Sequence, residues 1–149
     1  MRSISTEAIL FNPDPAAYLP HRDPFLYIDR ITSLEPGVSA TALLQIASDC
    51  RGFPPILLLE AMAQVGGIAA GQQEGERGIL AAFERAELPP EVRPGDRVMV
   101  QTRIVKGFGK LFLMEGQAIV EGEVIAAAML TLAVDQHGER WGVRDKGRP

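Results

Sequence analysis

The chain has 149 residues, the usual length of one domain, and its 46% hydrophobic and 23% charged residues are ordinary for a globular protein. Because 15 lysines and arginines stand against 19 acidic residues, the net charge is −4, which argues against wholesale nucleic-acid binding. A single cysteine excludes an internal disulfide, and no Cys/His cluster suggests a zinc site, so we expect neither metal nor cofactor. We expect a cytoplasmic protein, since residues 1–10 do not resemble a signal peptide and polar residues interrupt every long apolar stretch.

The first third of the chain predicts a turn with a short helix, followed by two strands. Proline-rich residues 13–20 predict the turn and helix, and residues 25–31 are rich in aromatic and β-branched side chains, which favour a strand. In residues 38–46 every second side chain is apolar, from Val38 to Ile46. This alternation is typical of a half-buried strand.

Residues 56–70 predict a helix buried on nearly every side. Two prolines precede it, and proline suits a first helical turn because its missing N–H would be unpaired there anyway. The segment is apolar all round except for Glu60, Gln64 and the pair Gly66 and Gly67. A small sheet cannot cover such a helix fully, and the glycines allow close backbone approach, so we expect a homodimer.

Four further strand-like runs, separated by glycine-containing turns, cover residues 79–85, 97–105, 111–120 and 124–134. One central helix with a run of antiparallel strands predicts an α+β fold in which a curled sheet wraps the helix. We expect a single domain over residues 1–149, with its core at about 18–134 and a polar tail from 135. The pattern does not fix the strand order.

Glu60 is the first candidate for chemistry. Burial disfavours the charged form of a carboxyl group, so an acid on a buried helix can serve as general acid or base. Gln64 lies one turn later on the same face and could hold the Glu60 side chain. The structural alternative, a glutamate that only stabilises the helix dipole, has roughly equal weight.

The two histidines and the cysteine are weaker candidates. His137 lies in a polar segment typical of an exposed turn, and Cys50 has no nearby base to make it a nucleophile. His21 precedes an apolar segment and could pair with Glu60, although a structural hydrogen-bonding role fits the pattern better. Between residues 93 and 110 five basic residues face a single aspartate, and this basic patch could dock an acidic partner: Arg93, Arg97, Arg103, Lys106 and Lys110.

Three motifs resemble the FabZ-type 3-hydroxyacyl-[acyl-carrier-protein] dehydratases. Residues 19–30 are similar to the family's Leu-Pro-His-Arg-x-Pro-Phe-Leu-x-x-Asp-Arg opening, and residues 60–64 to its Glu-Ala-Met-Ala-Gln helix motif. Residues 94–96 match its Pro-Gly-Asp turn before a long strand. The resemblance covers roughly residues 18–134, and the first two motifs together are specific.

The resemblance implies a hotdog fold, a homodimer or larger oligomer with active sites between subunits, and a place in fatty-acid or related acyl-chain biosynthesis. Family members remove water from 3-hydroxyacyl chains carried on acyl carrier protein, so the expected partner is that carrier or an acyl-CoA. They use a glutamate of the central helix, here Glu60, with a histidine from the partner subunit. A backbone N–H at the helix start receives the thioester carbonyl.

The chain departs from this pattern just before the helix. The family's His-Phe-Pro run is shortened here to residues 49–55, and the histidine position falls on Ile46 or in a gap. The family's Pro-Gly at the helix start is Pro54-Pro55, and proline has no N–H to donate, which leaves the Ile56 amide as the substitute. We therefore take as candidate substrate-binding residues Phe53, Pro55, Ile56 and Gln64.

Three functions remain open at this point. The first is dehydration of acyl thioesters by Glu60, alone or with His21, which we expect to be absent or far slower than in a relative with the histidine. The second is a non-catalytic binder of acyl carrier protein, or a partner subunit of an intact relative. The third is a hotdog thioesterase in which Glu60 activates water.

Overall fold

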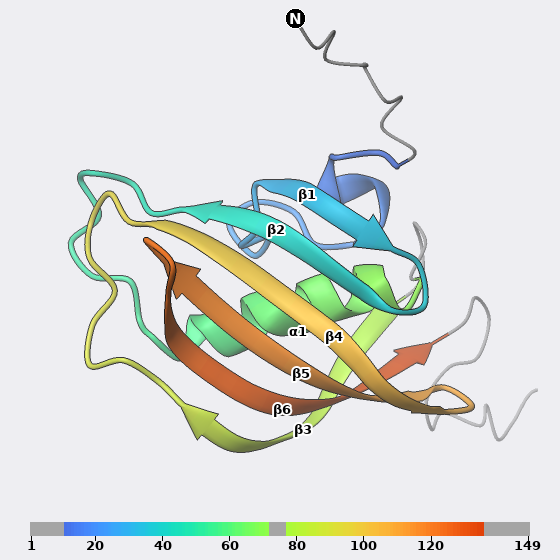
Figure 1. Cartoon of the computed structure of the whole chain (residues 1–149). Coiled ribbons are helices and arrows are strands. Elements are labelled where there is room, and N and C mark those ends of the chain that lie inside the picture. Colours follow the sequence, from blue (N-terminus) through green and yellow to red (C-terminus); the bar gives the residue numbers. More distant parts are fainter. Residues whose placement is uncertain (1–10, 72–76, 136–149) are drawn as a thin grey trace, which may run out of the picture.

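The computed structural model describes residues 11–71 and 77–135, which form one curled sheet and one long helix (Figure 1). A short 3-10 helix, η1 (Pro15–Ala17), precedes them. The elements then follow in the order β1 (Arg30–Glu35), β2 (Ser39–Gln45), α1 (Leu57–Ala69), β3 (Arg77–Glu87), β4 (Arg97–Phe108), β5 (Leu111–Val120) and β6 (Glu123–Asp135).

The six strands make one antiparallel sheet in the order β1-β2-β4-β5-β6-β3, and the sheet wraps around α1 (Figure 1). The turn between β5 and β6 is tight, with Glu121 and Gly122 at φ values of 50° and 79°. Positive φ at both central residues matches the twist of a two-residue hairpin. The predicted α+β hotdog architecture is confirmed, and the strand order that the sequence left open is now defined.

Helix α1 is the centre of the core, as predicted. Its residues from Leu58 to Ala69 are buried, with Glu60 as the exception. The hydroxyl of Thr102 on β4 donates a hydrogen bond of 2.7 Å to the carbonyl of Met62. A Cβ added to Gly66 would lie 2.5 Å from the sulfur of Met114 on β5. Gly66 therefore allows the helix to pack closely against the sheet of the same chain. From the sequence we had expected this glycine to allow close approach of a second subunit.

The first strand begins later than the sequence predicted. The prediction of a strand over residues 25–31 is wrong for 25–29, because β1 starts at Arg30. Residues 25–27 instead pack over α1, and only Asp29 joins β2, where its N–H donates to the Leu43 carbonyl at 2.8 Å. The other strands match their predictions to within a few residues, and β4 extends beyond its predicted end at Val105 to Phe108.

Within residues 11–71 and 77–135, strand β3 lies at one edge of the sheet and pairs only with β6. From Ala81 to Glu87 its side chains are exposed on both faces, including Phe83 at 47%.

No helix in the described part of the chain is long and apolar enough to cross a membrane. The predicted polar tail, including His137, lies outside the described residues beyond Asp135.

Candidate functional site

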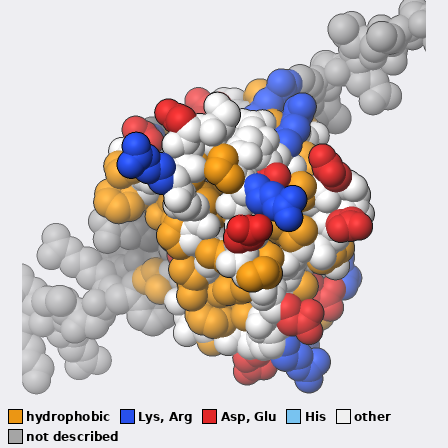
Figure 2. Space-filling model, turned by 90° about the vertical axis from the view of Figure 1, so that its left-hand side faces the viewer, with side chains coloured by type: hydrophobic (Ala, Val, Ile, Leu, Met, Phe, Trp, Pro, Cys, Tyr) orange, Lys and Arg blue, Asp and Glu red, His pale blue; other side chains and the backbone are white. Residues whose placement is uncertain are grey.

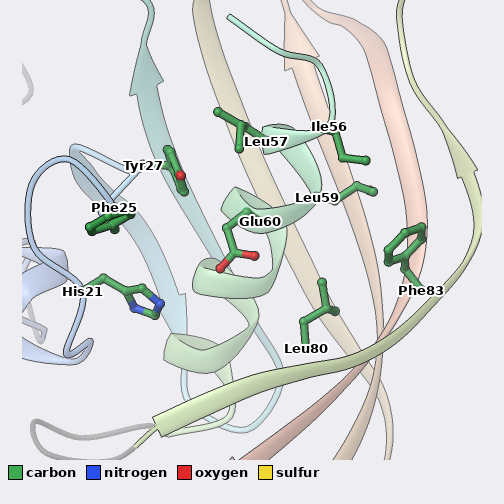
Figure 3. Close-up of a pocket in the computed structure, with 9 residues that line it drawn as sticks. All are labelled: His21, Phe25, Tyr27, Ile56, Leu57, Leu59, Glu60, Leu80 and Phe83. Carbon is green, nitrogen blue, oxygen red and sulfur yellow. The ribbon is translucent and has the colours of Figure 1, made fainter.

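A pocket of about 480 Å³ opens beside the first turns of α1 (Figure 3). Three parts of the chain form it: the segment between η1 and β1, the start of α1, and strand β3. Its lining consists of His21, Phe25, Tyr27, Ile56, Leu57, Leu59, Glu60, Leu80 and Phe83. The structure thus brings together three of the residues that the sequence singled out, His21, Ile56 and Glu60.

Glu60 lies in the first turn of α1 and directs its carboxyl group into this pocket (Figure 3). It is half-buried, so the expectation of burial on nearly every side does not extend to this side chain. Within the described part of the chain its carboxyl group makes no hydrogen bond or ion pair. An unpartnered carboxyl group in a pocket is available to a ligand as donor, acceptor or base.

Apolar side chains form the wall of the pocket on the side of Glu60 away from His21 (Figure 3). Ile56 and Leu59 come from the helix, and Leu80 and Phe83 come from β3. Strict alternation would put Leu80 and Phe83 on opposite faces of a strand. The register shift between Leu80 and Ala82 inserts an extra residue, which turns both side chains to the pocket.

His21 reaches the pocket from the segment that follows η1, and its ring points toward Glu60 (Figure 3). The Nδ1 atom of the ring is buried and has no hydrogen-bond partner in the described part of the chain. The backbone around His21 is fixed by Arg22, whose guanidinium donates to the carbonyls of Leu19 at 2.6 Å and His21 at 2.8 Å. Leu19 itself is only 1% exposed and anchors the segment in the core.

Gln64 supports the pocket from behind instead of lining it. Its side-chain oxygen accepts from the Tyr27 N–H at 3.0 Å, and its amide nitrogen donates to the Phe25 carbonyl at 2.8 Å. Both ends of this buried amide are therefore bonded to the segment opposite the helix. The expectation that Gln64 binds substrate or holds Glu60 gives way to a role in fixing the pocket wall.

The start of α1 leaves one backbone donor free beside the pocket. The N–H groups of Leu57, Leu58 and Leu59 donate to carbonyls three residues earlier, at 2.9, 3.0 and 3.1 Å. Within the described part of the chain the N–H of Ile56 has no acceptor. A free N–H at a helix start attracts a partial negative charge such as a carbonyl oxygen.

Phe53 and Pro55 line a different groove from the one that contains Glu60. That groove has a volume of about 370 Å³ and runs between residues 51–55 and the segment around Val92, to which Phe53 forms a β-bridge. The sequence had grouped Phe53 and Pro55 with Ile56 as substrate-binding residues. Of these three, only Ile56 belongs to the Glu60 pocket.

The predicted basic patch is spread along β4. Arg97 and Lys106 are nine residues apart on this strand, which at the usual strand rise separates them by about 30 Å. Arg93 and Arg97 lie at the end where α1 starts, and Lys106 and Lys110 lie at the opposite hairpin (Figure 1). The expectation of one local patch is therefore wrong. The surface at the α1 start mixes basic and acidic side chains (Figure 2).

Several of these cations already contact a neighbour: Arg93 with Glu91 at 3.4 Å, Arg103 with Glu115 on β5, and Lys106 with the Phe108 ring at 4.7 Å. Arg97 is exposed.

Cys50 is half-buried and packs against the core. Among residues 11–71 and 77–135 no group of three His, Cys, Asp or Glu side chains could hold a metal ion.

The sequence did not identify several of the lining residues. Leu57 and Leu59 adjoin Ile56 and Glu60, so helical spacing could have indicated them. Phe25 and Tyr27 were predicted to belong to a strand and not to a pocket. Leu80 and Phe83 of β3 face the pocket together because of a register shift, which the sequence composition does not reveal.

The chain is similar to known proteins both in sequence and in fold. Residues 19–129 match the family model of the FabA-like domain. A 3-hydroxyacyl-[acyl-carrier-protein] dehydratase FabZ of Oleidesulfovibrio alaskensis is 35% identical over 131 residues, which covers 78% of this chain and 85% of the relative. The FabZ of Bacillus subtilis is 34% identical over 131 residues, covering 79% and 93%. Among solved structures, the dehydratase heterocomplex ApeI:P of Xenorhabdus doucetiae superposes with a TM-score of 0.75 at 17% identity, covering 85% of this chain and 93% of that one, which shows a shared fold.

Proposed function

Since the chain belongs to the family of FabZ-type 3-hydroxyacyl-[acyl-carrier-protein] dehydratases of fatty-acid biosynthesis, we propose that it binds acyl thioesters of acyl carrier protein in the Glu60 pocket. The observation that carries this proposal is the division of the pocket. One side offers the Glu60 carboxyl group, and the other offers an apolar wall from α1 and β3. An acyl thioester has the same division, with a polar head and an apolar chain.

The orientation of the ligand follows from the helix start. The thioester carbonyl accepts a hydrogen bond from the Ile56 N–H, the substitute for the donor that Pro55 cannot supply. The acyl chain then runs along Leu59 toward Leu80 and Phe83. Glu60 faces the carbon atoms next to the carbonyl, where a general acid or base acts in this chemistry.

Dehydration by this site is absent or far slower than in a family member that carries the loop histidine. Residues 46–56 contain no histidine, so a second copy of this chain brings none to Glu60 from that segment. Loss of water needs a base for the proton beside the carbonyl and an acid for the departing hydroxyl. One positioned group contributes about 10²–10⁴-fold in rate, so its loss is measurable.

Two other functions have an observation in their favour. A thioesterase fits the unpartnered Glu60 carboxyl group, which could activate a water molecule against the thioester. A partner subunit of a different family member fits the exposed β3 edge, whose outer backbone groups have no strand partner in the described part of the chain. A homodimer through the same edge is the simpler assembly, and we propose it first.

Mass spectrometry of 3-hydroxyacyl carrier protein incubated with the chain distinguishes these functions in one experiment. The proposed function predicts a complex with the loaded carrier and slow or no loss of water from the acyl group. Release of free carrier thiol that depends on Glu60 supports the thioesterase. A complex only after addition of an intact family member supports the partner subunit. No association with loaded carrier under any of these conditions contradicts the proposal.

A further inference from the structure

We infer that His21 recognises the 3-hydroxyl group of the acyl chain through a hydrogen bond from its Nε2–H. The inference rests on the proposed function and deepens it, because it makes 3-hydroxyacyl groups, and not acyl groups in general, the preferred ligand. It concerns a histidine of the same chain as Glu60. The proposed role of His21 is therefore separate from that of any residue that a partner subunit places in the site.

The two nitrogen atoms of the His21 ring have different surroundings. Nδ1 is buried and lacks a hydrogen-bond partner among the described residues. Nε2 makes no hydrogen bond in that part of the chain either, yet it is not among the buried atoms, so it remains accessible from the pocket that His21 lines. A polar group bound between His21 and Glu60 can therefore reach Nε2.

The surroundings of Nδ1 select the tautomer. An uncharged imidazole carries its hydrogen on one nitrogen and leaves the other as an acceptor. A hydrogen on Nδ1 would be a buried donor without an acceptor, and unpaired buried donors are rarer in proteins than unpaired acceptors. The hydrogen therefore resides on Nε2. His21 thus presents a donor to the pocket, and a hydroxyl oxygen is a suitable acceptor.

The order of groups along the pocket matches the order of groups in a 3-hydroxyacyl thioester. Ile56 precedes Glu60 by four residues, about 6 Å along the helix axis. His21 lies across the pocket from the helix and points toward Glu60 (Figure 3). A thioester carbonyl bound at the Ile56 N–H directs the following carbons past Glu60, where the hydroxyl oxygen meets His21.

The backbone that carries His21 is also held in place before any ligand binds. Arg22 bonds the backbone at positions 19 and 21, and Gln64 bonds the backbone at 25 and 27. These bonds fix the segment on both sides of the histidine. A donor carried on a fixed backbone loses less conformational freedom on binding than one on a mobile segment, which favours selectivity for the group it meets.

The test compares two ligands that cannot be turned over. Carrier protein is loaded with a 3-hydroxyacyl group or with the unsubstituted acyl group of the same length, each through an amide in place of the thioester. Isothermal titration then gives the Kd of each carrier for the full-length chain. We expect about five- to tenfold tighter binding of the 3-hydroxyacyl carrier, as one neutral hydrogen bond provides.

Variants of His21 distinguish a hydrogen-bond donor to the ligand from a residue that only supports the fold. His21→Leu should bind both carriers with the affinity that the unmodified chain shows for the acyl carrier. His21→Gln, which keeps a side-chain N–H, should retain most of the preference for the hydroxyl. His137→Leu, which removes the chain's other histidine, should retain all of it.

The remaining outcomes are equally definite. Equal binding of the two carriers by the unmodified chain, or loss of the preference in Tyr27→Phe but not in His21→Leu, overturns the role of His21 and leaves the proposed function standing. Failure to bind either carrier contradicts the proposed function itself. If His21→Leu does not fold, retention of the preference in His21→Gln and its loss in His21→Ala decide the same point.

Discussion

The side-chain oxygen of Gln64 accepts a hydrogen bond of 3.0 Å from the backbone N–H of Tyr27, a residue 37 positions earlier in the chain. The same amide donates to the Phe25 carbonyl at 2.8 Å. Gln64 is 2% exposed, so its side chain depends on these two bonds to pair its polar atoms. One buried side chain thus ties the non-helical wall of the pocket to the helix that carries Glu60.

Replacing Gln64 by leucine should destabilise the protein and weaken its binding of acyl carrier protein. The change leaves the Tyr27 N–H and the Phe25 carbonyl, whose bonds to Gln64 are both part-buried, without their partner. At about 1–2 kcal/mol for each group, we expect a loss of roughly 2–4 kcal/mol in the free energy of unfolding. Urea denaturation measures this loss. The control Gln117→Ala, on the exposed face of β5, should change stability by less than about 0.5 kcal/mol. A variant Gln64→Leu as stable as the control would contradict the role of these bonds.

Long-range bonds of this kind mark the limit of what the sequence predicts. Strand β5 is predicted to the residue, because alternation and flanking glycines are local signals. The strand expected over 25–31 is misplaced because its aromatic residues pack over α1, through a bond to a residue far along the chain. The site shows the same division. Glu60 follows from the helix pattern and the Ile56 amide from the family resemblance, whereas the wall at Leu80 and Phe83 depends on a register shift.

We predict that the chain forms a homodimer through the β3 edge. Among the residues that the structure describes, strand β3 is paired on one side only, and its residues 81–87 are exposed on both faces. Phe83→Glu should shift the protein to monomer in light scattering at micromolar concentration and weaken acyl binding, because Phe83 lines the pocket. Phe108→Glu, at an exposed position in the distant hairpin, should remain dimeric. An unmodified chain that is monomeric would count against the assembly.

We predict that an acidic carrier docks at the end of the sheet where α1 and the pocket begin. Arg97 is exposed at this end, and Arg97→Glu should slow association with the carrier and flatten its dependence on salt. Lys106→Glu is the matched control, because it makes the same charge change on the same strand about 30 Å away. Arg103→Glu should have a smaller effect than Arg97→Glu, since Arg103 already pairs with Glu115. Stopped-flow rates that are equal for Arg97→Glu and Lys106→Glu would exclude this docking end.

Dehydration of 3-hydroxyacyl carrier protein should be at least about 10²-fold slower than in a family member with the loop histidine. Glu60 fills one of the two acid–base roles, and residues 46–56 supply no histidine for the other. The rate of loss of water, followed by mass spectrometry, checks this prediction. Rapid turnover that survives His21→Leu and disappears in Glu60→Gln would instead demonstrate a mechanism with a single acid–base residue.

Photo-crosslinking from the acyl chain tests the central claim, that the pocket around Glu60 holds the acyl group. Carrier protein is loaded with a 3-hydroxyacyl group that ends in a diazirine, irradiated with the chain, and digested for tandem mass spectrometry. The account predicts crosslinks on the apolar wall of the pocket, at Leu59, Leu80 or Phe83. These crosslinks should disappear when an excess of unlabelled 3-hydroxyacyl carrier competes. Crosslinks confined to the groove between residues 51–55 and Val92, or to the outer face of the sheet, would contradict the claim that the Glu60 pocket holds the acyl group.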